Sequence, residues 1–147
     1  MSKMIVNELL ATLESQRSFL KDLDLPSDQL NFVPNGSKNS IGILLEHITG
    51  AEKSLIQQMV FGIEINRDRE KEFESKTRSL EELKKEYLAS AEITKSLLST
   101  KLEDDQLFDE RERRGNQKTV FWAIVHAIEH NNYHIGQIYL LLALLKQ

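Results

Sequence analysis

Hydrophobic positions recur at intervals of three and four residues along most of the chain, which is the spacing of amphipathic α-helices. Four such stripes predict four long helices, each bounded by turn or capping residues. The first two are expected over about residues 3–23 and 40–60. The third begins at the capping box that starts at Ser79 and ends near residue 101. The fourth is capped by Thr119 and runs to the C-terminus.

Two polar connections, residues 62–78 and 103–118, separate the last three of these helices. Helices of about 20 residues are about 30 Å long and suit a four-helix bundle. The first polar connection is long enough to return along the whole bundle, so we expect the second and third helices to run parallel, joined by a crossover. The shorter connection before them predicts that the first and second helices are antiparallel neighbours. The expected fold is all-α, with one domain over residues 1–147.

The amino-acid composition and net charge exclude several classes of function. The chain has no cysteine among its 147 residues, which excludes a disulfide, a thiolate nucleophile and a cysteine-ligated zinc site. Its net charge is −4, and its basic clusters, Arg67–Arg69 and Arg111–Arg114, are interleaved with acids, which favours solvated charge over nucleic-acid binding. The N-terminus lacks the features of a signal peptide, and the longest apolar run, Ile138–Leu145, is too short to span a bilayer. We therefore expect a cytoplasmic protein without a membrane partner.

The four histidines carry the candidate chemistry. His126, His130 and His134 follow one another at intervals of four in the last helix, where neighbours lie one turn apart on one face. Because the outer two are about 12 Å apart along the axis, one ion would take either His126 with His130 or His130 with His134. His47, on or beside the buried stripe of the second helix, is the remaining candidate for a third ligand. The alternative is a set of hydrogen-bonded core or rim histidines without a metal.

Two segments around these histidines are distinctive. Ser40–Ile48 ends in a histidine and an apolar residue, and in Val125–Ile138 the last two histidines are four residues apart, with Ile-Gly-Gln and an apolar tail after them. Together with the phrase Leu30–Pro34 before the second helix, these segments resemble the DinB-like (DinB/YfiT-like) family of metal-binding four-helix-bundle proteins. The resemblance extends over essentially the whole chain.

The resemblance implies a ligand set of His47, His130 and His134. His126, one turn earlier, would then line the pocket or contact a ligand. Gln137, three residues after His134, is placed to orient a ligand through its second ring nitrogen, as are Ser54 and Gln58 on the face of His47; polar contacts between helices are the alternative role for all three. Where the family commonly has Arg, this chain has Ile135, so any contact of that Arg with an anionic substrate or a dimer partner is lost.

Three neutral imidazoles leave a coordination position open, which is the layout of a catalytic site. Zinc and nickel both suit these ligands. Relatives include bacillithiol-dependent S-transferases and mycothiol-dependent maleylpyruvate isomerases, in which the metal is thought to hold the sulfur of a small thiol. The resemblance thus implies a metal-dependent transferase or isomerase that uses a low-molecular-weight thiol and a small-molecule substrate. The alternative is a non-catalytic, metal-binding stress-response protein.

The run Ile138–Leu145 is apolar nearly all round, whereas a helix that faces one bundle core needs only a narrow apolar stripe. We therefore expect a homodimer that packs partly through the last helix. The alternative cover is the connection 62–78 of the same chain, through Ile63, Ile65 and Phe73.

Overall fold

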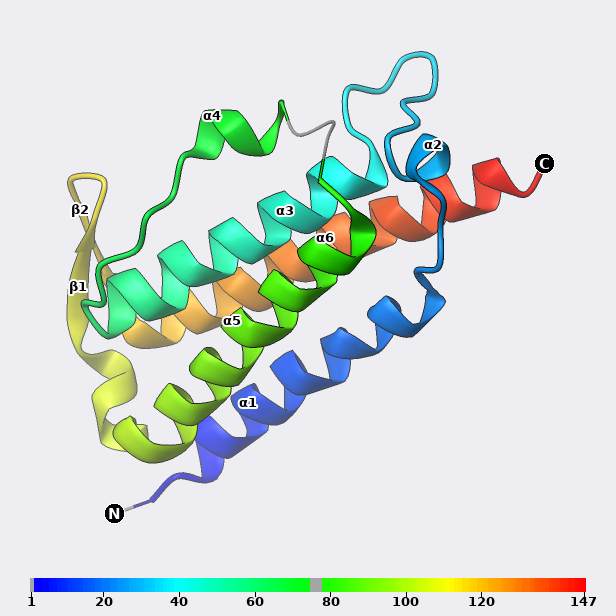
Figure 1. Ribbon diagram of the computed structural model, residues 1–147. Coiled ribbons are helices and arrows are strands. Elements are labelled where there is room, and N and C mark those ends of the chain that lie inside the picture. Colours follow the sequence, from blue (N-terminus) through cyan, green and yellow to red (C-terminus); the bar gives the residue numbers. More distant parts are fainter. Residues whose placement is uncertain (1, 75–77) are drawn as a thin grey trace.

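Four long helices form the body of the protein in a computed structural model that describes residues 2–74 and 78–147 (Figure 1). The predicted connection 62–78 is therefore described except for residues 75–77, which lie outside the described residues. The long elements are α1 (Met4–Ser15) with a 3₁₀ extension (Gln16–Asp22), α3 (Ile41–Glu52) with a π-helical extension (Lys53–Val60), α5 (Leu80–Lys101) and α6 (Val120–Leu145). The short elements are α2 (Ser27–Leu30), α4 (Arg69–Glu72), a 3₁₀ turn (Asp104–Phe108), β1 (Glu110–Arg113) and β2 (Asn116–Thr119).

Local capping explains where three of the long helices begin. The side chains of Ser40, Ser79 and Thr119 each accept a hydrogen bond from the backbone N–H three residues later, at 3.2, 3.1 and 3.0 Å. Each bond satisfies an amide that the helix itself leaves without a partner. The predicted starts of the second, third and fourth helices are thus confirmed, as is the all-α bundle.

Around the bundle, neighbouring long helices follow one another in the order α1, α5, α3, α6, and α6 packs against α1. Figure 1 shows that α3 and α5 both run from the end that holds the C-terminus toward the hairpin, so they are parallel and joined by the predicted crossover. The first and second long helices are antiparallel, as predicted, but they lie diagonally across the bundle, so the prediction that they are neighbours is wrong. The physical reason is that the connection crosses the end of the bundle, where Leu30 of α2 is buried against Gly42.

A polar layer divides the hydrophobic core into two clusters. Glu52 of α3 is 2% exposed, and its carboxylate accepts two hydrogen bonds from Arg17, at 2.7 and 3.2 Å, and one from Asn131 at 3.1 Å. Arg17 also donates to the phenol oxygen of Tyr87 at 3.0 Å. Burial raises the pKa of Tyr87 to about 12, although the neighbouring guanidinium opposes the shift. A charged group can be buried at this depth because each member has a hydrogen-bonding partner.

The connection 103–118, predicted only as a polar connection, contains a β-hairpin. Strands β1 and β2 are antiparallel, with Glu110 opposite Thr119 and Arg113 opposite Asn116. The tight turn places Arg114 at φ 51° and Gly115 at φ 84°, the left-handed backbone that two-residue hairpins require. The hairpin stands at the end of α3 and leads directly into α6 (Figure 1).

The crossover after α3 lies along the outer side of that helix, and α4 packs against it. Ile63 and Ile65 line a cavity between α3, α5 and the crossover, and Phe73 contacts His47. In the described part of the crossover these apolar residues therefore face α3, which does not support the alternative in which they cover the last helix. No helix among the described residues has the length and apolar character needed to cross a membrane.

Candidate metal centre

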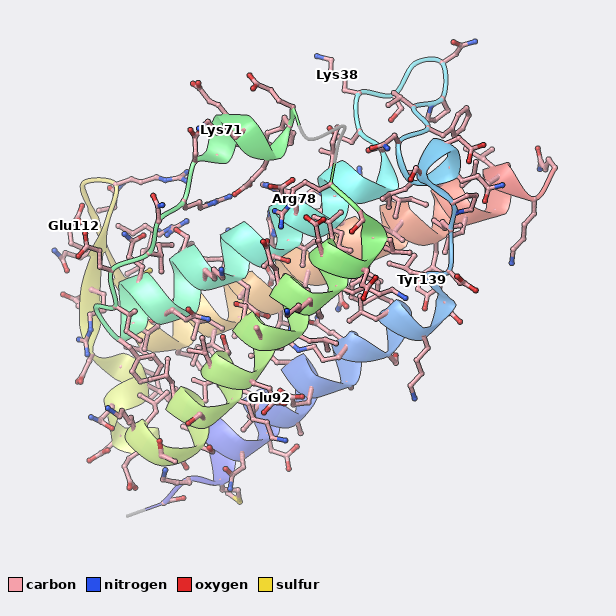
Figure 2. All side chains as sticks on the ribbon, viewed as in Figure 1. Lys38, Lys71, Arg78, Glu92, Glu112 and Tyr139 are labelled. Atoms are coloured by element: carbon pink, nitrogen blue, oxygen red, sulfur yellow. The ribbon has the colours of Figure 1, made fainter. Side chains whose placement is uncertain are left out.

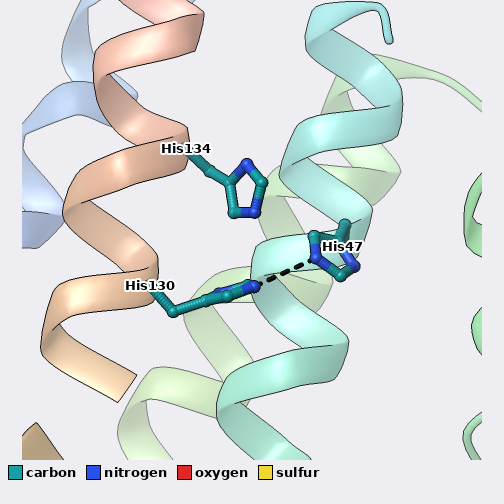
Figure 3. Close-up of side chains that lie close together, drawn as sticks. All are labelled: His47, His130 and His134. Carbon is teal, nitrogen blue, oxygen red and sulfur yellow. Dashed lines mark hydrogen bonds between the residues drawn. The ribbon is translucent and has the colours of Figure 1, made fainter. Parts of the chain in front are cut away.

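Three imidazoles point toward one another between α3 and α6 (Figure 3). His47 comes from α3, and His130 and His134 come from successive turns of α6. One ring nitrogen of each lies within 4.8 Å of those of the other two, and the Nε2 atoms of His47 and His130 are 3.1 Å apart. The structure thus brings together the three histidines of the predicted ligand set, and this group could hold a metal ion.

The Nδ1 atom of His47 lies 3.1 Å from Oε1 of Glu72, which belongs to α4 in the crossover. Burial raises the pKa of Glu72, but hydrogen bonds from His47 and Arg67 outweigh it and hold the pKa below its usual value. The carboxylate is therefore ionised and can only accept a hydrogen bond. Nδ1 of His47 must then carry the proton, which leaves the lone pair of Nε2 directed into the centre.

The same arrangement recurs at His134. Its Nδ1 lies 2.7 Å from Oε1 of Gln137, so the ring donates from Nδ1 and Nε2 remains free to bind a ligand. At His130, in contrast, the Nδ1 atom is buried without a hydrogen-bond partner among the described residues. Gln137 thus occupies the position proposed for it from sequence, where it fixes the ring nitrogen of His134 that points away from the centre.

Two of the three rings, those of His130 and His134, are held in their neutral form. Burial lowers the pKa of His130 to about 3, and His134, His47, His126 and Arg67 add to the shift. Burial also lowers the pKa of His134, with an opposing contribution from the hydrogen bond to Gln137. Neutral imidazole is the form that binds a metal ion, so at neutral pH no proton competes for the lone pairs of these two rings.

The residues present fit a tetrahedral divalent ion. Two nitrogens bound to one such ion at about 2.0–2.1 Å lie about 3.3–3.4 Å apart, close to the 3.1 Å between His47 and His130. Two of the three rings donate from the nitrogen that faces away, one to a carboxylate and one to an amide oxygen. Histidines that bind a metal usually donate in this way from the ring nitrogen that does not bind the metal.

Glycine at position 50 allows the crossover to approach the centre. Arg67 holds the Glu72 carboxylate with two hydrogen bonds, at 2.7 and 3.0 Å. A Cβ atom on Gly50 would lie 2.8 Å from Nε of Arg67 and would overlap the Glu72 carboxylate. The ion pair can therefore rest against α3 only because position 50, one turn after His47, lacks a side chain.

His126 lies outside this group of nitrogen atoms, one turn before His130. Its ring stacks on Trp122, with centroids 4.6 Å apart and planes 10° from parallel. The Nζ atom of Lys118 lies over the Trp122 ring, 5.2 Å from its centroid. Aromatic residues also border the triad itself, because Phe73 lies 5.0 Å from His47 and Tyr133 lies 5.0 Å from His134. His126 thus continues the histidine column of α6 without joining the triad.

Sequence reasoning missed Glu72 and Arg67. Both lie in the crossover, where charged residues are usually solvated. Arg67 contacts Glu72, and Glu72 contacts His47, which is 25 positions away in the sequence. Ser54 lies on the face of His47 as expected, yet it contacts Arg113 of the hairpin and not a histidine. Ile135 is buried in the core cluster with Ile48 and Ile138, so its side chain does not reach solvent as a substrate contact would.

Comparisons with known proteins agree with the fold. A family model described as "Protein of unknown function (DUF1572)" matches residues 2–147. The crystal structure of a DinB-like protein from Bacillus cereus ATCC 10987 is similar with a TM-score of 0.71, at 17% sequence identity over 92% of this chain and 86% of that chain. At this identity the likeness shows a shared fold. The search of curated proteins found no match.

Proposed function

The chain belongs to the DUF1572 family and has a DinB-like fold, and we propose that it is a metal-dependent transferase or isomerase that uses a low-molecular-weight thiol such as bacillithiol. The metal would be a divalent ion, zinc or nickel, held by His47, His130 and His134. The observation that supports this proposal is the convergence of three imidazoles, two of which are fixed from behind by Glu72 and Gln137.

Three protein ligands favour a catalytic over a structural centre, because structural zinc sites are closed by four protein ligands. When bound, a divalent ion supplies a positive charge that lowers the pKa of a thiol and keeps the sulfur in its nucleophilic thiolate form. The protein's own part is to hold the rings. Glu72 keeps the proton of His47 on Nδ1, Gln137 does the same for His134, and the ring of Phe73 packs against that of His47.

The proposal is tested by adding a neutral thiol, 2-mercaptoethanol, to the protein loaded with Co²⁺. We expect a sulfur-to-cobalt charge-transfer band in the near ultraviolet that saturates with thiol, because a three-histidine site leaves a position for the sulfur. Protein in which His47 and His130 are both replaced by alanine should give no band. Cobalt bound by the wild-type chain without any thiol band would contradict the transferase proposal and favour a non-catalytic metal-binding protein.

The second half of α6 supports a homodimer, which we propose as the functional assembly. Tyr133, Leu140 and Leu144 are 66%, 63% and 39% exposed, at spacings that place them along one side of the helix. An isolated chain would present this apolar stripe to water, whereas a two-fold pairing buries it against its own copy.

Light scattering on the purified protein should therefore give about twice the chain mass of 17.0 kDa. Leu140→Glu should shift the mass toward that of one chain, because it places a charge in the apolar stripe. Glu92→Lys, an exposed charge change on α5, is the matched control and should leave the mass unchanged. A mass near 17.0 kDa at every concentration of wild-type protein would rule the dimer out.

A further inference from the structure

The β-hairpin turns its arginines toward the body of the protein. In β1, Glu110 and Glu112 are exposed, while Arg111 and Arg113 are half-buried, because successive strand residues point to opposite faces. The inner face of the hairpin is therefore cationic, although the strand as a whole is neutral. Glu112 marks the hairpin in Figure 2, where the strands stand beside the end of α3.

A cavity of about 420 Å³ adjoins the inner face of the hairpin. Its other wall is the π-helical end of α3, and a π-helix is a rare element that occurs mostly at functional sites. The volume is within the range of about 300–1,000 Å³ that is usual for small-molecule sites. The residues that line the cavity are Ser54, Gln58, Met59 and residues 111–114, which include three arginines and one carboxylate.

The guanidinium of Arg113 has most of its hydrogen-bonding capacity free. It donates from Nη1 to the hydroxyl oxygen of Ser54 at 3.1 Å, and among the described residues no carboxylate lies within ion-pair distance of it. Because an arginine carries five N–H donors, four of them have no acceptor in the part of the chain that the structure describes. Arg111, in contrast, donates to the carbonyl oxygens of Val60 and Glu110 and lies 3.9 Å from Asp109.

The hydroxyl group of Ser54 adds another donor at the same place. Ser54 is 7% exposed, and its oxygen accepts the hydrogen bond from Arg113. A hydroxyl can also donate one proton, and Ser54 has no acceptor for that proton among the described residues. Thr49 shows the usual alternative in a helix, since it donates to the carbonyl oxygen of Leu45 at 2.9 Å. A buried hydroxyl proton and a free guanidinium therefore border one cavity.

The charges that act on Arg113 are mostly positive. Burial lowers the pKa of Arg113, and the positive charges of Arg114 and Arg67 lower it further. The carboxylate that lines the cavity, Glu112, accepts a hydrogen bond from the backbone N–H of Gly115 in the turn of the hairpin. An anion in the cavity would offset the repulsion among the arginines and would meet donors whose acceptors are missing.

This cavity is separate from the histidine triad. Gly50 lies on α3 between His47 and Ser54, and the ion pair of Arg67 with Glu72 packs against it. None of the three histidines lines the cavity. A molecule bound beside Arg113 would therefore be a second ligand, which does not touch the metal centre.

We propose that Arg113 and Ser54 form a binding site for an oxyanion, the phosphate or carboxylate group of a small molecule, in the cavity between the hairpin and α3. The fork of the guanidinium matches two oxygens of either group, and the Ser54 hydroxyl can donate to one of them. Since the triad takes no part in this site, the proposal goes beyond the thiol function and does not depend on it.

Two simple anions test the site in metal-free, ¹⁵N-labelled protein. Inorganic phosphate and acetate are titrated separately at constant ionic strength, and the Nε–H signal of Arg113 is followed by NMR. We expect at least one anion to shift this signal saturably, and the anion that binds more tightly identifies the group as phosphate or carboxylate. The Nε–H signal of Arg69, an exposed arginine of α4, is the internal control and should not saturate. The absence of a saturable shift with both anions would overturn the proposal.

Three variants show whether the two proposed residues bind the anion, with the backbone amide signals of residues 54–58 as the readout. Arg113→Gln should weaken binding at least about tenfold, the effect of losing a charge-assisted contact, and Ser54→Ala should weaken it about fivefold. Lys95→Gln, which removes an exposed positive charge from α5, is the matched control and should bind as the wild type does. Circular dichroism shows whether each variant keeps its helices. Binding that is unchanged in folded Arg113→Gln would refute the site.

Discussion

Replacement of His130 by alanine is expected to abolish the binding of divalent metal, from one ion per chain to none. His130 is the ring that lies closest to His47, with their Nε2 atoms 3.1 Å apart, and it shares one helix face with His134. Its loss leaves one nitrogen on α3 and one on α6, too few for a stable site of the zinc type. The measurement is the metal content of purified protein after dialysis against zinc or nickel, with circular dichroism to show that the helices remain.

His126→Ala is the matched control, because it removes a histidine from the same face of α6 one turn earlier. Metal content should stay near the wild-type value, since His126 stacks on Trp122 and lies outside the triad. Glu72→Gln should keep the ligands but weaken binding by about 10- to 100-fold, because the proton of His47 loses its carboxylate acceptor. Equal loss of metal in His126→Ala and His130→Ala would contradict the assignment of the ligands.

The helices could be predicted because their determinants are local. A Ser or Thr cap acts on an amide three residues away, and the apolar stripes repeat within each helix, so Ser40, Ser79 and Thr119 marked true starts. The row of histidines on α6 could be predicted for the same reason, since a spacing of four places residues on one helix face. Residue spacing left open whether His126 or His134 pairs with His130, and the resemblance to a known family then selected His134.

The surroundings of the triad depend on contacts between distant segments, which residue spacing does not encode. Glu72 and Arg67 lie in a polar crossover whose composition is that of a solvated loop, and only the fold brings them against α3. Gly50 was the one local signal, a glycine inside a helical stripe where alanine would be the better helix former. The alternation of Glu and Arg in residues 110–113 was likewise visible, but it indicates one cationic face only once the segment is known to be a strand.

Glu52→Ala is expected to cause the largest loss of stability among single substitutions in the bundle. The change leaves the guanidinium of Arg17 buried in the core without its carboxylate, and removing one partner of a buried ion pair costs about 3–5 kcal/mol. For a chain of this size the midpoint of thermal unfolding should fall by about 10 °C. Thermal and urea unfolding of the metal-free protein measure the effect without a contribution from the centre.

A double variant in the polar layer provides a further comparison. We expect Glu52→Ala to destabilise the protein because it leaves the charge of Arg17 unpaired, and not because a polar side chain is lost. The double variant Arg17→Met with Glu52→Leu fills the same space with apolar side chains and should unfold at a higher temperature than Glu52→Ala, despite carrying one more substitution. Glu82→Ala, which removes an exposed partner 4.0 Å from Arg78, should change the free energy of unfolding by less than about 1 kcal/mol. If Glu52→Ala proved as mild as Glu82→Ala, the layer between the two core clusters would not be held by the Arg17–Glu52 pair.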